Sequence, residues 1–319
     1  MKKLSVIIPA YQAEALIPKC LSSISTNTLD LEVLIVNDGS TDRTEAVCRE
    51  FAQKDPRICV WTKKNEGPGA AREYAITRAQ GEYITFVDAD DYIEPGTYDE
   101  LAQYLDGTLD VVEFGYKTVD TDGNLISRHP MKEERYCGSA CSVHYARQKN
   151  TTNFLWNKLF KRELFQDLTF PHLFAGEDAA LLAQVFVRAK RCQAVSNLYY
   201  NYVMTPDSLC RRPFSEKRMD NIRAYQFIDG FYSQHAPALC YYAKQKLCSV
   251  VATLYCECVL TTEEQVQIWC DKLISEYKKA RAGMSLPTLL RHGSLNRRML
   301  LLLFTLSPKL CAFMYSWKR

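Results

Sequence analysis

Residues 83–91 read YITFVDADD, an apolar run that passes directly into three aspartates. The aromatic and β-branched residues of 83–87 predict a buried strand. The stretch after it, Asp88-Ala89-Asp90-Asp91, predicts a β-turn that aims three carboxylates into solvent. Carboxylates this close repel one another unless a cation or protons intervene. We interpret the turn as a site for a divalent metal that also holds a diphosphate. The alternative is an Asp-rich cap on the helix that follows.

Further strand-like runs flank this stretch, at residues 4–9, 31–36, 58–62 and 111–116. Helical spacing of apolar residues separates them, including a predicted helix over 70–79. This alternation is typical of βαβ units and predicts the α/β class, with a mainly parallel sheet and helices on both faces. Polar residues follow several of the strands, so we expect them at one edge of the sheet, where such folds bind ligands.

The pattern changes along the second half of the chain. A helix is predicted over 177–189 and a Tyr-rich strand over 193–203, and the pattern beyond about residue 214 is helical throughout. We therefore expect two domains, an α/β domain over 1–214 and a helical region over 215–319.

Two segments before the acidic stretch are candidates for ligand binding. Asp38 follows a predicted strand and could accept a hydrogen bond from a nucleotide base or ribose, unless it only forms an Asx-turn. The segment Asn65-x-Gly67-x-Gly69-x-x-Arg72 matches neither a Walker loop nor the dinucleotide fingerprint. Arg72 could reach a phosphate or hold Asp88, and the alternative is an ordinary loop with a surface arginine.

Two later segments carry further candidates. Glu177 and Asp178 fall in the first turn of a predicted helix, whose dipole favours an ionised carboxylate and so suits a general base. Acidic residues are also common in first turns without any such role. Trp156 could offer an aromatic platform for a sugar ring or could be a core residue.

Several of these motifs occur in one order that resembles the family 2 inverting glycosyltransferases. The resemblance covers about residues 4–205, and it rests on residues 6–11, 36–42, 65–72, 86–91, 156–160 and 176–178. It implies the GT-A fold, which is Rossmann-like, and a nucleotide-sugar donor, usually a UDP-sugar. It covers no part of residues 215–319, so it does not identify the acceptor.

The resemblance also implies roles for individual residues. Asp90 resembles the ligand of Mn²⁺ or Mg²⁺, and Asp178 resembles the catalytic base. Trp156 and Glu177 are candidates for acceptor binding, and Ser208 and Arg211 for a loop over the diphosphate. The implied donor contacts are Pro9, Ala10, Tyr11, Asp38, Asn65, Gly67, Arg72, Asp88 and Ala89.

Charge is distributed unevenly along the 319 residues. Residues 277–319 contain nine Lys or Arg and no Asp or Glu, which leaves 31 bases against 37 acids in residues 1–276. An acidic body is a poor nucleic-acid binder, because affinity for a duplex comes mainly from neutralised phosphates. Two apolar runs, 299–306 and 310–317, are separated by Pro308 and Lys309. We expect residues 285–319 to lie on an anionic membrane surface, or alternatively to form a helix packed on the body.

Together these features predict a metal-dependent inverting glycosyltransferase that extends a cell-surface glycan or a lipid-linked acceptor. The apolar run at the start ends at Pro9 and is too short for a signal peptide, so we expect a cytoplasmic enzyme at the inner face of the cell membrane. A nucleotidyltransferase and a catalytically inactive sugar-nucleotide-binding protein are the alternatives. We allow for a homodimer, and the sugar and the acceptor hydroxyl stay open.

Overall fold

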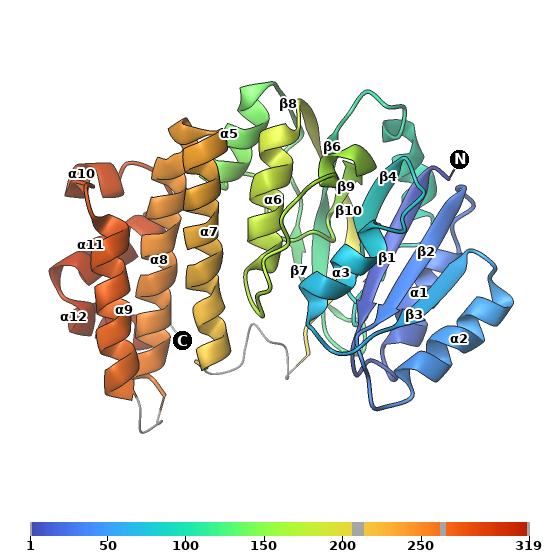
Figure 1. Ribbon diagram of the computed structural model, residues 1–319, viewed down its shortest axis with the longest axis horizontal. Helices are drawn as coiled ribbons and strands as arrows, with labels where there is room; N and C mark the ends of the chain where they lie inside the picture. The colour runs from blue at the N-terminus through green and yellow to red at the C-terminus, as the bar shows by residue number, and fades with distance from the viewer. Residues whose placement is uncertain (1, 206–213, 262–265, 318–319) are drawn as a thin grey trace. The chain divides into compact units, whose positions relative to one another are not determined.

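The computed structural model describes residues 2–205, 214–261 and 266–317 (Figure 1). The chain divides into two compact units. The first comprises residues 1–142, 150–172 and 184–206, and the second comprises residues 143–149, 173–183 and 207–319. A single boundary near residue 214 was expected. The second unit instead takes in two earlier segments, because both bond to the helix over Asp220–His235: Phe174 N–H donates to Asp220, and Gln148 donates to Tyr225.

The first unit is built on one mixed sheet. Its strands, in chain order, are β1 (Leu4–Ala10), β2 (Leu31–Asn37), β3 (Ile58–Thr62), β4 (Tyr83–Phe86), β5 (Tyr92–Ile93), β6 (Val111–Val119), β7 (Leu125–His129), β8 (Glu134–Cys137), β9 (Lys158–Lys161) and β10 (Arg191–Val203). The main path runs β3-β2-β1-β4-β9-β6-β10-β5, with β7 beside β6 and β8 beside β10. Along this path β9 and β5 run opposite to the other strands, so the expected mainly parallel sheet is confirmed.

Helices cover both faces of the parallel part of this sheet. Residues 4–8 of β1 are fully buried, although alternate side chains of a strand point to opposite faces. Val6 and Ile8 pack in one core cluster with α1 (Ile17–Ser25). Helix α3 (Pro68–Ile76) also packs against β1 and β2. Helix α2 (Thr44–Lys54) packs against β2 and β3. A strand covered in this way reads as a continuous apolar run, which explains why β1, β2 and β4 are recognisable in the sequence.

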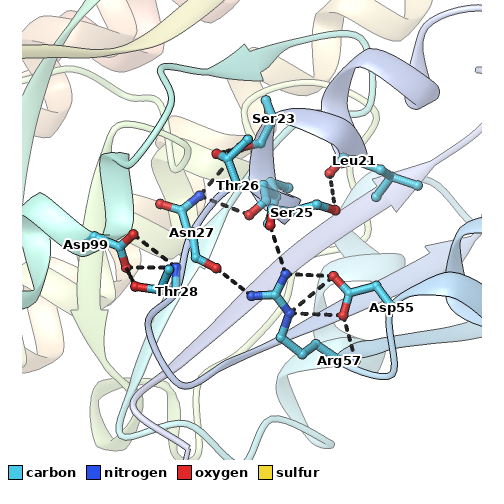
Figure 2. A network of polar contacts seen from close by, with 10 residues as sticks. Leu21, Ser23, Ser25, Thr26, Asn27, Thr28, Asp55, Arg57 and Asp99 are labelled. Carbon is cyan, nitrogen blue, oxygen red and sulfur yellow. Dashed lines mark hydrogen bonds and ion pairs between the residues drawn. The ribbon is translucent and has the colours of Figure 1, made fainter.

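A polar network ties the elements at the amino ends of β2 and β3 (Figure 2). Arg57, just before β3, pairs with Asp55 and donates to the carbonyl oxygens of Ser25, the last residue of α1, and of Asn27 after it. Asp99 in α4 (Thr97–Leu101) accepts from the backbone N–H groups of residues 28 and 29. The bond to Ser25 satisfies a carbonyl group in the last turn of α1, where such groups lack partners within the helix. They stabilise the edge of the sheet opposite to the predicted ligand edge.

The second unit is helical. Two helices, α5 (Ser139–Arg147) and α6 (Glu177–Arg188), contribute residues to both units. The others are α7 (Asp220–His235), α8 (Cys240–Val259), α9 (Val266–Arg281), α10 (Leu286–Leu289), α11 (Leu295–Leu306) and α12 (Pro308–Ser316). Figure 1 shows α7, α8 and α9 side by side, and α11 and α12 pack against α8. The Phe304 ring lies 5.1 Å from Tyr255 and 4.6 Å from Tyr277, between centroids. The predicted C-terminal helical region is therefore present, with its own apolar core.

Candidate active site

The carboxyl ends of three neighbouring parallel strands place the first group of candidates at one edge of the sheet. β1 lies between β2 and β4, and the N–H of Asp38 donates to the carbonyl oxygen of Ala10 (2.8 Å). Val87 N–H likewise donates to Ile7 (3.0 Å). Residues that follow these strands therefore lie at a common edge, as the sequence pattern predicts.

Residues 88–91, which we call the acidic turn, follow β4 directly. The N–H of Asp91 donates to the carbonyl oxygen of Asp88 (3.0 Å), which closes the turn. Arg72, itself buried in α3, donates from Nη2 to Asp88 Oδ1 (3.1 Å). Of the two roles considered for Arg72, holding Asp88 is thus observed. Ala89 is buried and Asp90 is exposed.

The acidic turn concentrates negative charge around Asp90. Although Asp90 keeps an exposed surface, partial loss of water around its carboxyl group, and then the charge of Asp88, raise its pKa to about 6. Both effects penalise the ionised form of a carboxyl group. A bound cation would favour that ionised form, so this pair of carboxylates has the electrostatics of a cation site.

Asp91 does not face solvent, which corrects the expectation that all three carboxylates do. Its side chain is 2% exposed, and its two oxygens accept hydrogen bonds from the Tyr200 hydroxyl (2.8 Å) and the Val203 N–H (2.7 Å). Burial, followed by the charges of Asp90 and Asp88, raises the pKa of Asp91 well above its usual range. Asp91 is therefore an anchor that joins the acidic turn to β10.

The remaining carboxylates fit a metal that a substrate helps to hold. No group of three His, Cys, Asp or Glu side chains in the described part of the chain is arranged to bind an ion by itself. Mg²⁺ is usually bound by one or two carboxylates, with substrate phosphates and water completing its shell. Asp90 and Asp88 supply oxygen ligands of this kind, so the residues present fit the expected Mn²⁺ or Mg²⁺.

Asp38 is buried and already bonded to the protein. Oδ1 accepts from Lys63 Nζ (3.2 Å) and the Glu66 N–H (3.1 Å), and Oδ2 accepts from the Gly67 N–H (2.8 Å). The expected Asx-turn is made by the neighbouring Asn37, whose side chain accepts from the Ser40 N–H. Because a carboxylate has about four acceptor sites, Asp38 keeps capacity for about one further bond. Its observed role is to fix the loop that precedes α3.

Glycines allow that loop to approach β2 closely. Gly39 has φ of +74°, and a Cβ there would lie 2.9 Å from the backbone nitrogen of Asn65. Gly67 has φ of +93° at the start of α3.

The other predicted donor contacts lie near this loop and the end of β1. Asn65 is exposed on the loop, and Tyr11 is 53% exposed after β1. Pro9 and Ala10 form the end of β1 beside them. An exposed ring, a backbone loop and a carboxylate pair therefore border the same edge.

Trp156 lies in the core, which corrects its assignment as a sugar platform. It is 3% exposed, and its ring stacks on Tyr200 (4.2 Å between centroids) and Phe154 (4.6 Å). An indole packed in this way has almost no surface left for a sugar. Through Tyr200, Trp156 instead supports the acidic turn, because that tyrosine bonds to Asp91.

The candidate base belongs to the second unit. Glu177 and Asp178 are the first two residues of α6, as predicted. Gly176 precedes them with φ of +84°, and a Cβ there would lie 2.8 Å from the Cβ of Ala224 in α7. The start of α6 is thus held by a close contact that only glycine permits. Ser208 and Arg211, the candidates for a diphosphate loop, lie outside the described residues.

Two residues of this site were not identified from the sequence. Tyr200 lies in the predicted Tyr-rich strand, where nothing distinguishes it from its neighbours, and it meets Asp91 across 109 positions of sequence. Lys63 bonds to Asp38 across 25 positions. In both cases the partner could have been sought because a buried carboxylate requires a hydrogen-bond donor. The sequence alone does not show which carboxylates are buried, so this reasoning could not be applied.

Comparison with known proteins places this geometry in context. The profile of the family Glycosyl transferase family 2 matches residues 5–169. A protein described as uncharacterized glycosyltransferase EpsJ, from Bacillus subtilis, is 29% identical over 73% of this chain and 71% of its own length. Glycosyltransferase GlyA of Streptococcus pneumoniae is 32% identical over 66% of this chain, which spans about a third (32%) of GlyA.

Among solved structures, the chain is similar to residues 1–349 of TarS from S. aureus. The structure of TarS in complex with UDP has a TM-score of 0.72 and 21% identity over 99% of this chain and 92% of that one. The structure in complex with UDP-GlcNAc has a TM-score of 0.73, and the match covers 98% of this chain and 89% of that one. These likenesses confirm the fold expected from the sequence.

Proposed function

The chain belongs to glycosyltransferase family 2, and from this premise we propose that it is a metal-dependent, inverting glycosyltransferase. Its donor is a nucleotide-sugar of the UDP type, and its acceptor is a cell-surface glycan or a lipid-linked precursor. The enzyme works on the cytoplasmic side of the cell membrane. The observation that carries the proposal is the acidic turn at the carboxyl end of β4, where Asp90 is exposed beside an Asp88 that Arg72 fixes.

The edge of the sheet supports a UDP-type donor. Tyr11 offers an exposed ring, and Asp38 with residues 65–67 offers polar groups next to it. A nucleoside bound there would carry its diphosphate toward the acidic turn, because the three strand ends are adjacent. UDP and UDP-GlcNAc are bound by TarS, a protein with the same fold.

Asp90 and Asp88 would hold the metal. When bound, the ion supplies positive charge that stabilises the departing diphosphate. Arg72 keeps Asp88 in place through the 3.1 Å bond, and Tyr200 keeps the turn itself in place through Asp91. Groups that are already oriented before the reaction stabilise developing charge without reorganising.

Asp178 would act as the base. The acceptor oxygen attacks C1 of the donor sugar as the bond between C1 and the diphosphate oxygen breaks, and the hydroxyl proton passes to the carboxylate of Asp178. The products are the glycosylated acceptor and UDP. Because a single displacement reverses the configuration at C1, the product anomer is inverted. The position of Asp178 at the start of a helix favours its ionised form, which is the form that accepts a proton.

Product analysis tests the proposed reaction. With Mn²⁺, a panel of UDP-sugars and a lipid-linked acceptor, we expect release of UDP that stops when a chelator is added. Release of pyrophosphate from UTP with a sugar phosphate would instead indicate a nucleotidyltransferase. Binding of UDP-sugars without turnover on any acceptor would indicate an inactive nucleotide-sugar-binding protein.

A further inference from the structure

The last two helices carry apolar side chains on two opposite faces. One face is buried against α8 and includes Leu301, Phe304, Cys311 and Ala312. This confirms the packed-helix alternative for the tail within the second unit. Packing on α8, however, accounts for only part of the apolar residues of these helices.

The other face is exposed. On α11, Leu295, Met299 and Leu306 are exposed at spacings of four and seven residues, which places them along one side of a helix. On α12, Leu310, Phe313 and Met314 are exposed on one side, and Trp317 follows at the end of the helix. Leu306 is 68% exposed and Trp317 is 79% exposed. We call these seven residues the outer apolar face.

From this face we propose that α11 and α12 form a docking surface for an anionic lipid bilayer. Positive charge lies close to it along the chain: Arg291, Arg298 and Lys309 are exposed, and residues 277–319 contain no Asp or Glu. Lipid headgroups of negative charge complement such a surface, while the apolar side chains enter the boundary between headgroups and acyl chains. Trp317, whose ring lies 5.7 Å from that of Phe313, has the amphipathic character favoured at that depth.

The dimensions of the helices support an orientation along the surface. α11 has 12 residues and α12 has 9. At 1.5 Å per residue, α11 is about 18 Å long, shorter than the roughly 30 Å hydrocarbon core of a bilayer. Within the described ranges, no helix combines the length and the apolar character that crossing a membrane requires.

Charge argues against a second copy of the chain as the occupant of this face. Two copies meeting through it would bring together two sets of Lys and Arg with no carboxylate from residues 277–319 between them. Like charges placed opposite one another disfavour association. The docking surface is independent of the proposed transferase reaction, and its test requires no turnover.

Vesicle flotation of the full chain tests the proposal. We expect co-flotation with vesicles of phosphatidylcholine mixed with phosphatidylglycerol, weaker flotation with phosphatidylcholine alone, and weakening by salt. The double substitution Phe313→Asp with Trp317→Asp should lower the partition coefficient about tenfold or more. The matched control is Ile268→Asp, which charges an equally exposed apolar residue (68%) on α9 and should leave the partition coefficient unchanged.

Further measurements distinguish loss of vesicle binding from unfolding of the variants and from dimer formation. Circular dichroism should show the same helix content in all variants, and Leu306→Asp provides a second test on α11 if the double variant unfolds. Equal flotation of the wild type and the outer-face variants would overturn the proposal. A second result would also overturn it. If the wild type does not bind vesicles but forms a dimer in sedimentation velocity, and the substitutions abolish that dimer, then the occupant of the outer apolar face is a second copy of the chain.

Discussion

The hydroxyl of Tyr200 donates a hydrogen bond to the buried carboxylate of Asp91 (2.8 Å) and accepts one from the N–H of Asp88 (3.1 Å). One phenol therefore joins the first and last residues of the acidic turn. Because Asp90 lies between them, its position depends on a residue of β10 that is far from it along the chain.

Tyr200→Phe should loosen the acidic turn. The substitution leaves a buried carboxylate and an N–H group without their partner, which should lower the free energy of unfolding by roughly 1–3 kcal/mol. Affinity for UDP in the presence of Mn²⁺ should fall as well. Denaturant unfolding and calorimetric titration measure the two effects.

Tyr83→Phe is the matched control for this substitution. The Tyr83 hydroxyl also makes two hydrogen bonds, to the carbonyl oxygen of Leu109 and from the N–H of Gly107, away from the acidic turn. We expect a similar loss of stability with unchanged UDP affinity. Equal UDP affinity in both variants would show that Tyr200 does not position the site.

Asp178→Asn should separate binding from turnover. An amide cannot accept the acceptor proton, so kcat should fall by about a hundredfold or more while affinity for the UDP-sugar persists. Glu177→Gln, one residue earlier, should raise the KM for the acceptor and change kcat little. A variant at Asp178 that retains most of its kcat would remove this residue from the base role.

Gly176→Ala should disturb the start of α6. The φ of +84° is unfavourable for alanine, and the new methyl group would meet the Cβ of Ala224. We expect a loss of roughly 1–3 kcal/mol in the free energy of unfolding, with a reduced kcat. In Gly230→Ala, within α7, the added methyl group meets no atom and the helix should gain about 0.5–1 kcal/mol. A loss of stability equal in both variants would contradict the close contact at Gly176.

Lys246 should make the stability of the second unit depend on pH. Burial, and then the charge of Arg297, lower the pKa of Lys246 from its ordinary 10.5 to about 7. Between these values the unfolded chain binds more protons at this residue than the folded chain, so its contribution to stability rises with pH. Lys246→Met should therefore be more stable than the wild type near pH 6, and the difference should shrink toward pH 10. Unfolding free energies of both proteins across this range test the sign, and a difference that grows with pH would contradict it.

Strands β1, β2 and β4 could be predicted because they are buried on both faces and so read as continuous apolar runs. The strand expected over 58–62 is confirmed at those residues, and those expected to begin at residues 4, 31 and 83 begin there. β9 was missed, because Lys158 and Lys161 at its ends interrupt the apolar pattern. Its Lys158 is buried with partners for its charge: Glu113, from β6, lies 3.4 Å away, and Nζ donates to the carbonyl oxygens of Thr152 and Phe154.

The limits at the site have a similar cause. Asp88, Asp90 and Asp91 are chemically identical in the sequence, and their different roles arise from Arg72 and Tyr200, which lie far along the chain. Trp156 could be either a platform or a core residue until its neighbours were known. Local patterns located the strand ends and the candidate carboxylates, whereas long-range contacts decided which carboxylates remain accessible.

The central claim, that the acidic turn binds the metal and diphosphate of the donor, is tested most directly by titrating UDP into Asp90→Asn with and without Mn²⁺. Asp122→Asn, an exposed aspartate in a turn after β6, is the control. We expect Mn²⁺ to strengthen UDP binding in the wild type and the control, and to have no effect in Asp90→Asn. A Mn²⁺ effect in Asp90→Asn as large as in the wild type would contradict the account.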